Sequence, residues 1–189
     1  MRIDAEENRA RIIAAARDLI AEAGPDVPMT RVARRAGVGK ATLYRRFPTR
    51  KDLVAQTYAD RHAQCSASWH EAARDPDPAR AFRETILRLC AAQVVDRGYT
   101  TAVLSGQGLD IDRADYDRAL SLLLDRARAA GALRPGIGAA DLWLLLAGNA
   151  GVIAVAGPGA PAASRRFAEH MLRSFAPDPA GHPRPASSG

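Results

Sequence analysis

MTRVARRAGVGKATLYRRF, residues Met29 to Phe47, is the most informative segment of this 189-residue chain. Pro28 suits the start of a short helix, because its missing N–H would have no partner there. Gly37 can adopt the positive φ that a tight turn requires. A second short helix is predicted from about Lys40 to Phe47. The segment therefore predicts two short helices joined by a glycine turn.

The small and apolar residues of this segment have the spacing that two steeply crossing helices need. Ala33 allows close approach of the second helix, and the run Ala33-x3-Gly37-x5-Leu43 matches a helix-turn-helix. The apolar anchors would be Val32, Val38, Leu43 and Phe47. A supporting helix is predicted before Gly24, where apolar residues recur on one helical face. They are Ile12, Ala16, Leu19, Ile20 and Ala23.

Positive charge is concentrated in the same part of the chain. From Pro28 to Lys51 there are eight basic residues and no acid. They are Arg31, Arg34, Arg35, Lys40, Arg45, Arg46, Arg50 and Lys51. The whole chain has a formal net charge of +6 and a pI of about 10.0. Charge concentrated in a short folded segment favours contact with phosphates, although a solvated surface would also carry it.

The segment from Arg9 to Leu53 resembles the DNA-binding domain of the TetR family of transcription regulators. The resemblance lies in the string Val32-Ala33, Ala36-Gly37-Val38, Thr42-Leu43-Tyr44 and Phe47. It implies an all-helical homodimer that binds double-stranded DNA. The charged N-terminus has no secretory pattern, so we expect a cytoplasmic protein. The rest of the chain is similar to the family only in length and helix count, and it does not identify an effector.

The resemblance assigns DNA contacts to particular residues. Lys40, Ala41 and Thr42 match the start of the recognition helix, which faces base edges in the major groove. Lys40 would donate to guanine, and Ala41 and Thr42 would contact a thymine methyl. Tyr44, Arg50 at the next helix start and Thr30 match phosphate contacts. Arg45 and Arg46 on the recognition helix would contact either the DNA backbone or a base.

Two positions depart from the family pattern. Val27-Pro28 stands where the second helix usually opens with a Ser or Thr cap, and Gly39 stands where Ser usually precedes the recognition helix. Glycine is an acceptable cap, but it lacks the hydroxyl. These departures put local contacts in doubt and leave the motif intact.

The remainder of the chain is predicted to be helical as well. Thr49 and Asp52 have the spacing of a capping box that opens a long helix to about Arg74. Further helices are predicted around 82–94, within 98–108, and over 112–130, 139–156 and 162–175. The fold class is all-α, with about nine helices. We expect a three-helix DNA-binding domain over 1–50, an effector-binding and dimerisation domain over 51–176, and a disordered tail over 177–189.

The family resemblance places the dimer interface on the last two helices. Gly148 and Gly151 would permit close helix packing, and Phe167, Leu172 and Phe175 would supply an apolar seam. Packing of these residues within one subunit is the alternative. The effector pocket would lie among the helices from Thr49 to Ala130, near the helix that carries Trp143. Its candidate residues are His62, Trp69, Gln93, Tyr116, Trp143 and Asn149.

We expect a repressor that an unknown small-molecule effector releases from a palindromic operator. An architectural DNA-binding protein without an effector is the alternative. An enzyme is disfavoured because the segment Gly37 to Thr42 lacks the G-x4-G-K-S/T pattern of a phosphate loop.

The histidines show no metal-binding spacing, so neither a metal nor a cofactor is expected. No apolar run approaches the roughly 18–20 residues of a membrane span, and Cys65 and Cys90 are expected as free thiols.

Overall fold

The structure, a computed structural model of the chain, describes residues 2–105 and 113–177. Side chains of residues 2, 3, 105 and 113–117 are outside this description. Its elements are α1 (Arg2–Ala23), α2 (Met29–Ala36), α3 (Lys40–Arg46), α4 (Arg50–Ala72), α5 (Pro78–Val95), α6 (Arg97–Ser105), α7 (Arg113–Ala129), α8 (Ala139–Ala156), a 3-10 turn (Gly157–Gly159) and α9 (Ala160–Phe175). These ranges contain helices and no strand, which confirms the all-α prediction.

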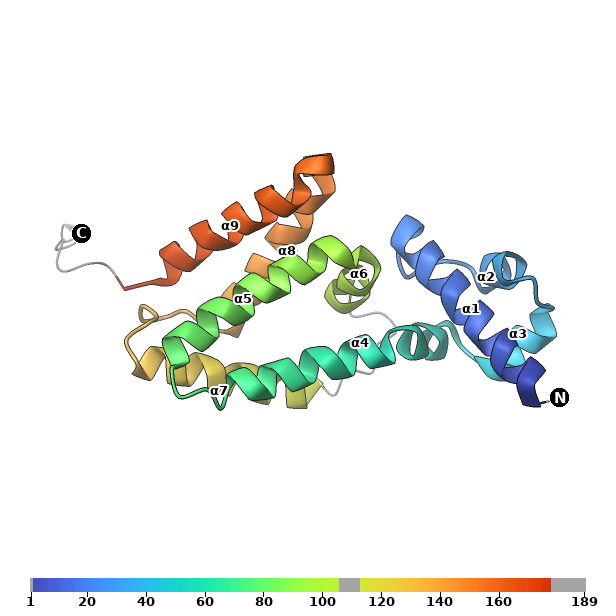
Figure 1. Cartoon of the computed structure of the whole chain (residues 1–189), viewed down its shortest axis with the longest axis horizontal. Coiled ribbons are helices and arrows are strands. Elements are labelled where there is room, and N and C mark those ends of the chain that lie inside the picture. Colours follow the sequence, from blue (N-terminus) through green and yellow to red (C-terminus); the bar gives the residue numbers. More distant parts are fainter. Residues whose placement is uncertain (1, 106–112, 178–189) are drawn as a thin grey trace, which may run out of the picture.

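The helices form two groups at opposite ends of an elongated molecule (Figure 1). Helices α1, α2 and α3 pack together at one end, and α5, α7, α8 and α9 form the other. The long helix α4 begins beside the first group and runs along the second. Each group has its own apolar core, and α4 contributes Leu53 and Tyr58 to one core and Trp69 to the other. The domain boundary near residue 50 remains a prediction.

The turn between α2 and α3 has the geometry that its sequence predicts. Gly37 has φ 64° and ψ 37°, a left-handed conformation that closes α2. Its neighbour Val38 donates its backbone N–H to the carbonyl of Ala33 at 3.0 Å. Arg11 of α1 also donates to the carbonyls of Ala36 and Gly37, at 2.6 and 3.1 Å. The supporting helix therefore holds the turn by hydrogen bonds as well as by packing.

The capping box predicted at the start of α4 is present. The Asp52 backbone N–H donates to Thr49 Oγ1 at 3.1 Å, and the Thr49 backbone N–H donates to Asp52 Oδ2 at 3.0 Å. By contrast, Pro28 and Gly39 cap α2 and α3 without a side-chain hydrogen bond. The first turns of these two helices consequently keep backbone N–H groups without a capping side chain.

Helix α8 is unusually apolar. Among the described residues, the stretch Ala139–Phe175 alone has the length and composition of a membrane-crossing segment, and it contains an apolar window of 18 residues with a mean hydropathy of 1.7. This is weak evidence for a membrane, since a core helix passes the same test. Only 22% of the apolar window is buried, however, so α8 exposes much of its apolar surface. The predicted tail, apart from Pro177, lies outside the described residues.

Candidate nucleic-acid interface and ligand pocket

Helix α3 is held by two buried anchors and presents the rest of its surface to solvent. Leu43 and Phe47 are fully buried against α1 and α2. Tyr44 is 45% exposed despite its large ring. The other α3 residues predicted to contact DNA are also accessible: Lys40, Ala41, Arg45 and Arg46 are exposed, and Thr42 is half-buried. Since α3 has only seven residues, these two anchors decide which side of it faces outward.

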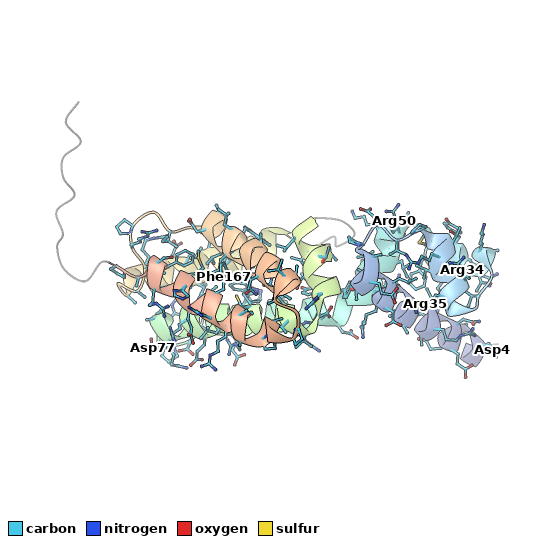
Figure 2. The ribbon with its side chains drawn as sticks, turned by 90° about the horizontal axis from the view of Figure 1, so that it is seen from above. Asp4, Arg34, Arg35, Arg50, Asp77 and Phe167 are labelled. Carbon is cyan, nitrogen blue, oxygen red and sulfur yellow. The ribbon has the colours of Figure 1, made fainter. Side chains whose placement is uncertain are left out.

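The remaining predicted contacts lie on the same end of the molecule. Thr30 is exposed in the first turn of α2, and Arg50 is exposed at the first position of α4. Figure 2 shows Arg50 with Arg34 and Arg35 at the end of the molecule opposite Asp77. The structure therefore brings the predicted DNA-contacting residues together on α2, α3 and the start of α4. We call this end of the molecule, with α1, the head.

Acids from outside the basic segment pair with several of its arginines. Arg50 Nη1 lies 2.7 Å from Asp26 Oδ1, and Arg46 Nη2 lies 3.5 Å from Glu6 Oε2. Arg35 Nη2 lies 2.6 Å from Glu22 Oε1. These exposed pairs add little stability, because water and salt screen them. A phosphate would compete with each carboxylate for its arginine.

The sequence reasoning missed part of α1 that lies beside the recognition helix. A hollow of about 270 Å³ separates the start of α1 from α3. Its lining residues are Ala5, Asn8, Arg9, Ile12, Thr42, Arg45 and Arg46. Asn8 and Arg9 had no local pattern to mark them, because only the tertiary packing of α1 brings them to α3. They extend the polar and basic surface of the head.

A small cavity of about 50 Å³ lies between the head and the second group of helices. It lies where α4, α5, α6 and α8 meet. Its lining residues are Arg61, Cys65, Leu89, Ala92, Gln93, Tyr99, Thr100, Val103, Leu104 and Leu146. The walls are mostly apolar with a few polar groups, the usual composition of a small-molecule site. The volume is far below that of a site that holds a drug-sized ligand.

Three of the six predicted pocket residues lie at the cavity or directly behind its wall. Gln93 lines the cavity, and His62 Nδ1 lies 3.3 Å from the Oη of Tyr99, which is also in the lining. Asn149 is fully buried behind Gln93 and donates its amide N–H to Gln93 Oε1 at 2.6 Å. Asn149 therefore positions a lining residue without reaching the cavity.

The other three candidates do not line this cavity. Trp69 is 1% exposed and belongs to the core of the second group, because its large ring fills space between α4 and its neighbours. Trp143 is half-buried on α8 outside the lining. Tyr116 lies on α7 where side chains are outside the described residues. Sequence reasoning in turn missed Arg61, Tyr99 and Thr100, which no linear motif marks.

Burial raises the pKa of two groups in this region above their ordinary values. It raises the pKa of Tyr99, and the neighbouring Cys65 raises it further, so the hydroxyl remains a hydrogen-bonding group at neutral pH. Burial likewise raises the pKa of the Cys90 thiol to about 12. Neither cysteine forms a disulfide; Cys90 belongs to the core and Cys65 lines the cavity.

Helix α6 connects the cavity to the head. Tyr99, Thr100 and Val103 of α6 line the cavity. On the same helix, Gly98 packs so closely on the head that an added Cβ would lie 3.3 Å from the backbone nitrogen of Ala21 in α1. The same Cβ would collide with the Tyr58 hydroxyl of α4. Helix α6 is therefore in close contact with both α1 and α4 at Gly98.

The residues predicted for the dimer interface divide into two sets. Leu172 and Phe175 are buried in the core of their own subunit, so their side chains are not on an outer surface. The half-buried Phe167 packs on Gly148, where an added Cβ would lie 2.9 Å from its Cζ. Gly151 is exposed with no atom near its Cβ direction. The expectation that Leu172 and Phe175 supply an apolar seam between subunits is therefore corrected, because both side chains pack within one subunit.

Family models match both parts of the chain. Residues 12–57 match the model described as bacterial regulatory proteins of the tetR family, and residues 77–173 match the C-terminal domain of SbtR-like transcriptional regulators. A curated HTH-type transcriptional regulator of Staphylococcus aureus is 46% identical over 54 residues, which are 28% of this chain and 29% of that protein. The chain thus matches less than a third of the length of that relative.

Solved structures are similar over nearly the whole chain. A TetR transcriptional regulator from Streptomyces coelicolor is 31% identical, with 90% of this chain and 99% of that chain covered and a TM-score of 0.52. NalD, a secondary repressor of a multidrug efflux pump in Pseudomonas aeruginosa, shares the fold at 19% identity, 94% and 100% coverage and a TM-score of 0.68. The fold and head define a helix-turn-helix transcription regulator. The chain belongs to the TetR family.

Proposed function

We propose that this protein is a homodimeric repressor that binds a palindromic operator and leaves it when a small molecule enters the cavity. The exposed face of α3 carries this proposal. Leu43 and Phe47 point into the core, and Lys40, Ala41 and Thr42 form the first turn of the helix that would enter the major groove. It acts in the cytoplasm by binding rather than by catalysis, and it needs no cofactor.

The phosphate contacts would surround this base-reading turn. Tyr44, Arg45, Arg46 and Arg50 are exposed on the head, and Thr30 is exposed at the start of α2. The uncapped first turns of α2 and α3 add free backbone N–H groups, which favour anions. Arg50 and Arg46 would exchange their carboxylate partners for DNA phosphates.

Dimerisation would bury an apolar face of α8 that the subunit leaves exposed. The exposed positions recur at helical spacing: Leu144, Ala147, Gly148, Gly151, Ala154 and Val155. Leu144 is 71% exposed and Val155 is 86% exposed. The small residues between them would let a second α8 approach closely, and Phe167 of α9 lies beside Gly148. Dimerisation would place two α3 helices on one DNA face, about 34–36 Å apart.

Release would follow from the packing of α6. A ligand larger than the cavity must push α6 away from α4 and α5. Because Gly98 is in close contact with α1 and α4, that movement would reorient the head. The ligand would weaken DNA binding only by its preference for the reoriented conformer.

Selection of binding sites from random double-stranded DNA tests the proposal. We expect a palindromic sequence, bound by the full chain with nanomolar to tens-of-nanomolar affinity. Joint replacement of Lys40, Tyr44 and Arg45 by alanine should lower the affinity on the order of a hundredfold or more. Arg83→Ala, an exposed change on α5, is the matched control. Sequence-independent binding would instead identify an architectural protein.

A further inference from the structure

A second cavity adjoins the first between α4 and α5. It has a volume of about 200 Å³. Its lining residues are Arg61, Gln64, Cys65, Ser68, Thr85, Arg88, Leu89 and Ala92. Four of these, Arg61, Cys65, Leu89 and Ala92, also line the inner cavity. The two spaces therefore adjoin. We call the first the inner cavity, the second the outer cavity, and the two together the path.

The outer cavity has a larger share of polar side chains in its lining than the inner cavity has. The outer cavity is lined by hydroxyl, amide and guanidinium groups, including those of Ser68 and Arg88. The inner cavity has Gln93, Tyr99 and Thr100 as polar lining residues besides Arg61, and the rest of its wall, including Leu89, Val103 and Leu146, is mostly apolar. A molecule that fits both has a polar end and an apolar end.

The charge at the junction is positive. Arg61 lines both cavities, and its guanidinium carbon lies 5.9 Å from the centre of the Tyr99 ring. Its Nε is buried without a hydrogen-bond partner among the described residues. An unsatisfied buried donor is costly, and an anionic acceptor would relieve that cost most strongly.

No acidic side chain of the described residues occurs in either lining. Asp96, which raises the pKa of Tyr99, accepts from the Tyr99 backbone N–H at 2.9 Å and caps the start of α6. It does not line either space. Arg88 of the outer cavity donates to Thr85 Oγ1 at 3.2 Å and carries a second positive charge. The path is therefore matched to a negative ligand.

We propose, on the basis of the function proposed above, that the effector is a small amphipathic carboxylate whose anionic group binds Arg61. Its apolar body enters the inner cavity and enlarges it by displacing α6. Arg61 lies on α4, eleven residues after Arg50, so the ligand binds the helix that begins at the DNA-binding head. The ligand thus contacts both elements that join the cavity to the head.

Three probes with one tail and different head groups test the charge preference. They are octanoate, 1-octanol and octylammonium. The full chain without DNA is titrated with each in a calorimeter, and the unfolding midpoint is recorded in parallel. We expect octanoate to bind at least about tenfold more tightly than the other two and to raise the midpoint most. Equal binding of the three, or no binding by any, would overturn the proposal.

Variants of Arg61 locate the site. Arg61→Met should weaken octanoate by at least about tenfold while 1-octanol changes by less than about twofold. Arg61→Lys keeps the charge and should retain intermediate affinity, which also controls for a folding defect. Arg83→Met removes an exposed arginine of α5 that lines neither cavity, and it should bind octanoate as the parent does. Unchanged octanoate affinity in Arg61→Met would overturn the assignment.

A DNA arm separates this inference from the proposed function. Octanoate that binds through Arg61 without weakening operator affinity would overturn its role as effector and leave the proposed DNA binding intact. Failure to bind any selected DNA would overturn the proposed function, whereas the titrations without DNA would still decide the anion site.

Discussion

The two ends of this molecule use their apolar and polar residues in different ways. In the head, a few anchors lie close together in sequence, and the residues between them are left exposed; Leu43 and Phe47 frame Tyr44 to Arg46 in this way. In the second group of helices, the cavity is assembled from four helices between Arg61 and Leu146. A local pattern therefore defines the surface of the head, whereas long-range packing defines the cavity.

The largest effect should come from removing an anchor of the recognition helix. Leu43→Ala deletes a fully buried side chain, and it should lower the free energy of unfolding by about 2 to 5 kcal/mol and abolish DNA binding. Leu122→Ala, at a half-exposed position of α7, should cost less than about 1 kcal/mol. Chemical denaturation measures both. Equal costs would show that the anchors do not differ from surface leucines.

The contact between the two ends should be sensitive to one methyl group. Gly98→Ala places a Cβ against Ala21 and Tyr58, so it should cost about 1 to 3 kcal/mol of folding free energy. It should also change operator affinity, because α6 shifts against α1. Gly159→Ala has open space around its Cβ and serves as the control in thermal unfolding and DNA titrations. An unaltered Gly98→Ala protein would mean that α6 does not couple the ends.

The exposed face of α8 should respond to charge only through assembly. Val155→Glu introduces a carboxylate at a position that is 86% exposed, so the isolated subunit should tolerate it. The proposed dimer would have to bury that charge, and its dissociation constant should rise at least about tenfold. Sedimentation at several concentrations measures this, with Leu122→Glu as the control. A dimer as tight as the parent would place the interface elsewhere.

The smallest effect should come from the ion pairs of the head. Glu6→Gln frees Arg46 from a carboxylate at 3.5 Å and should strengthen DNA binding by only a few-fold, since the pair is exposed and screened. Fluorescence anisotropy at low salt measures the change, which should shrink as salt rises. Glu84 pairs with Arg80 far from the head, so the control Glu84→Gln should leave DNA binding unchanged. Weaker binding by Glu6→Gln would show that Glu6 supports the interface.

Sequence reasoning succeeded where neighbours in the chain are also neighbours in space. The turn at Gly37 and the Thr49–Asp52 cap follow from backbone geometry within a few residues. It was less successful for the cavity, where Gln93 lines the wall but Trp69 fills the core. Both positions are compatible with a large or polar residue on an amphipathic helix. The same ambiguity applied to Leu172 and Phe175, which face inward on α9.

The amino-acid sequence alone determined that this chain is helical and that Met29 to Phe47 forms a helix-turn-helix, because the period of apolar residues and the freedom of Gly37 act locally. Only the tertiary structure decided which arginine reaches the cavity, which glycine joins α6 to the head, and which face of α8 lacks a cover. These features depend on how distant helices approach one another. Helical periodicity identifies an apolar face but does not specify which element will cover it.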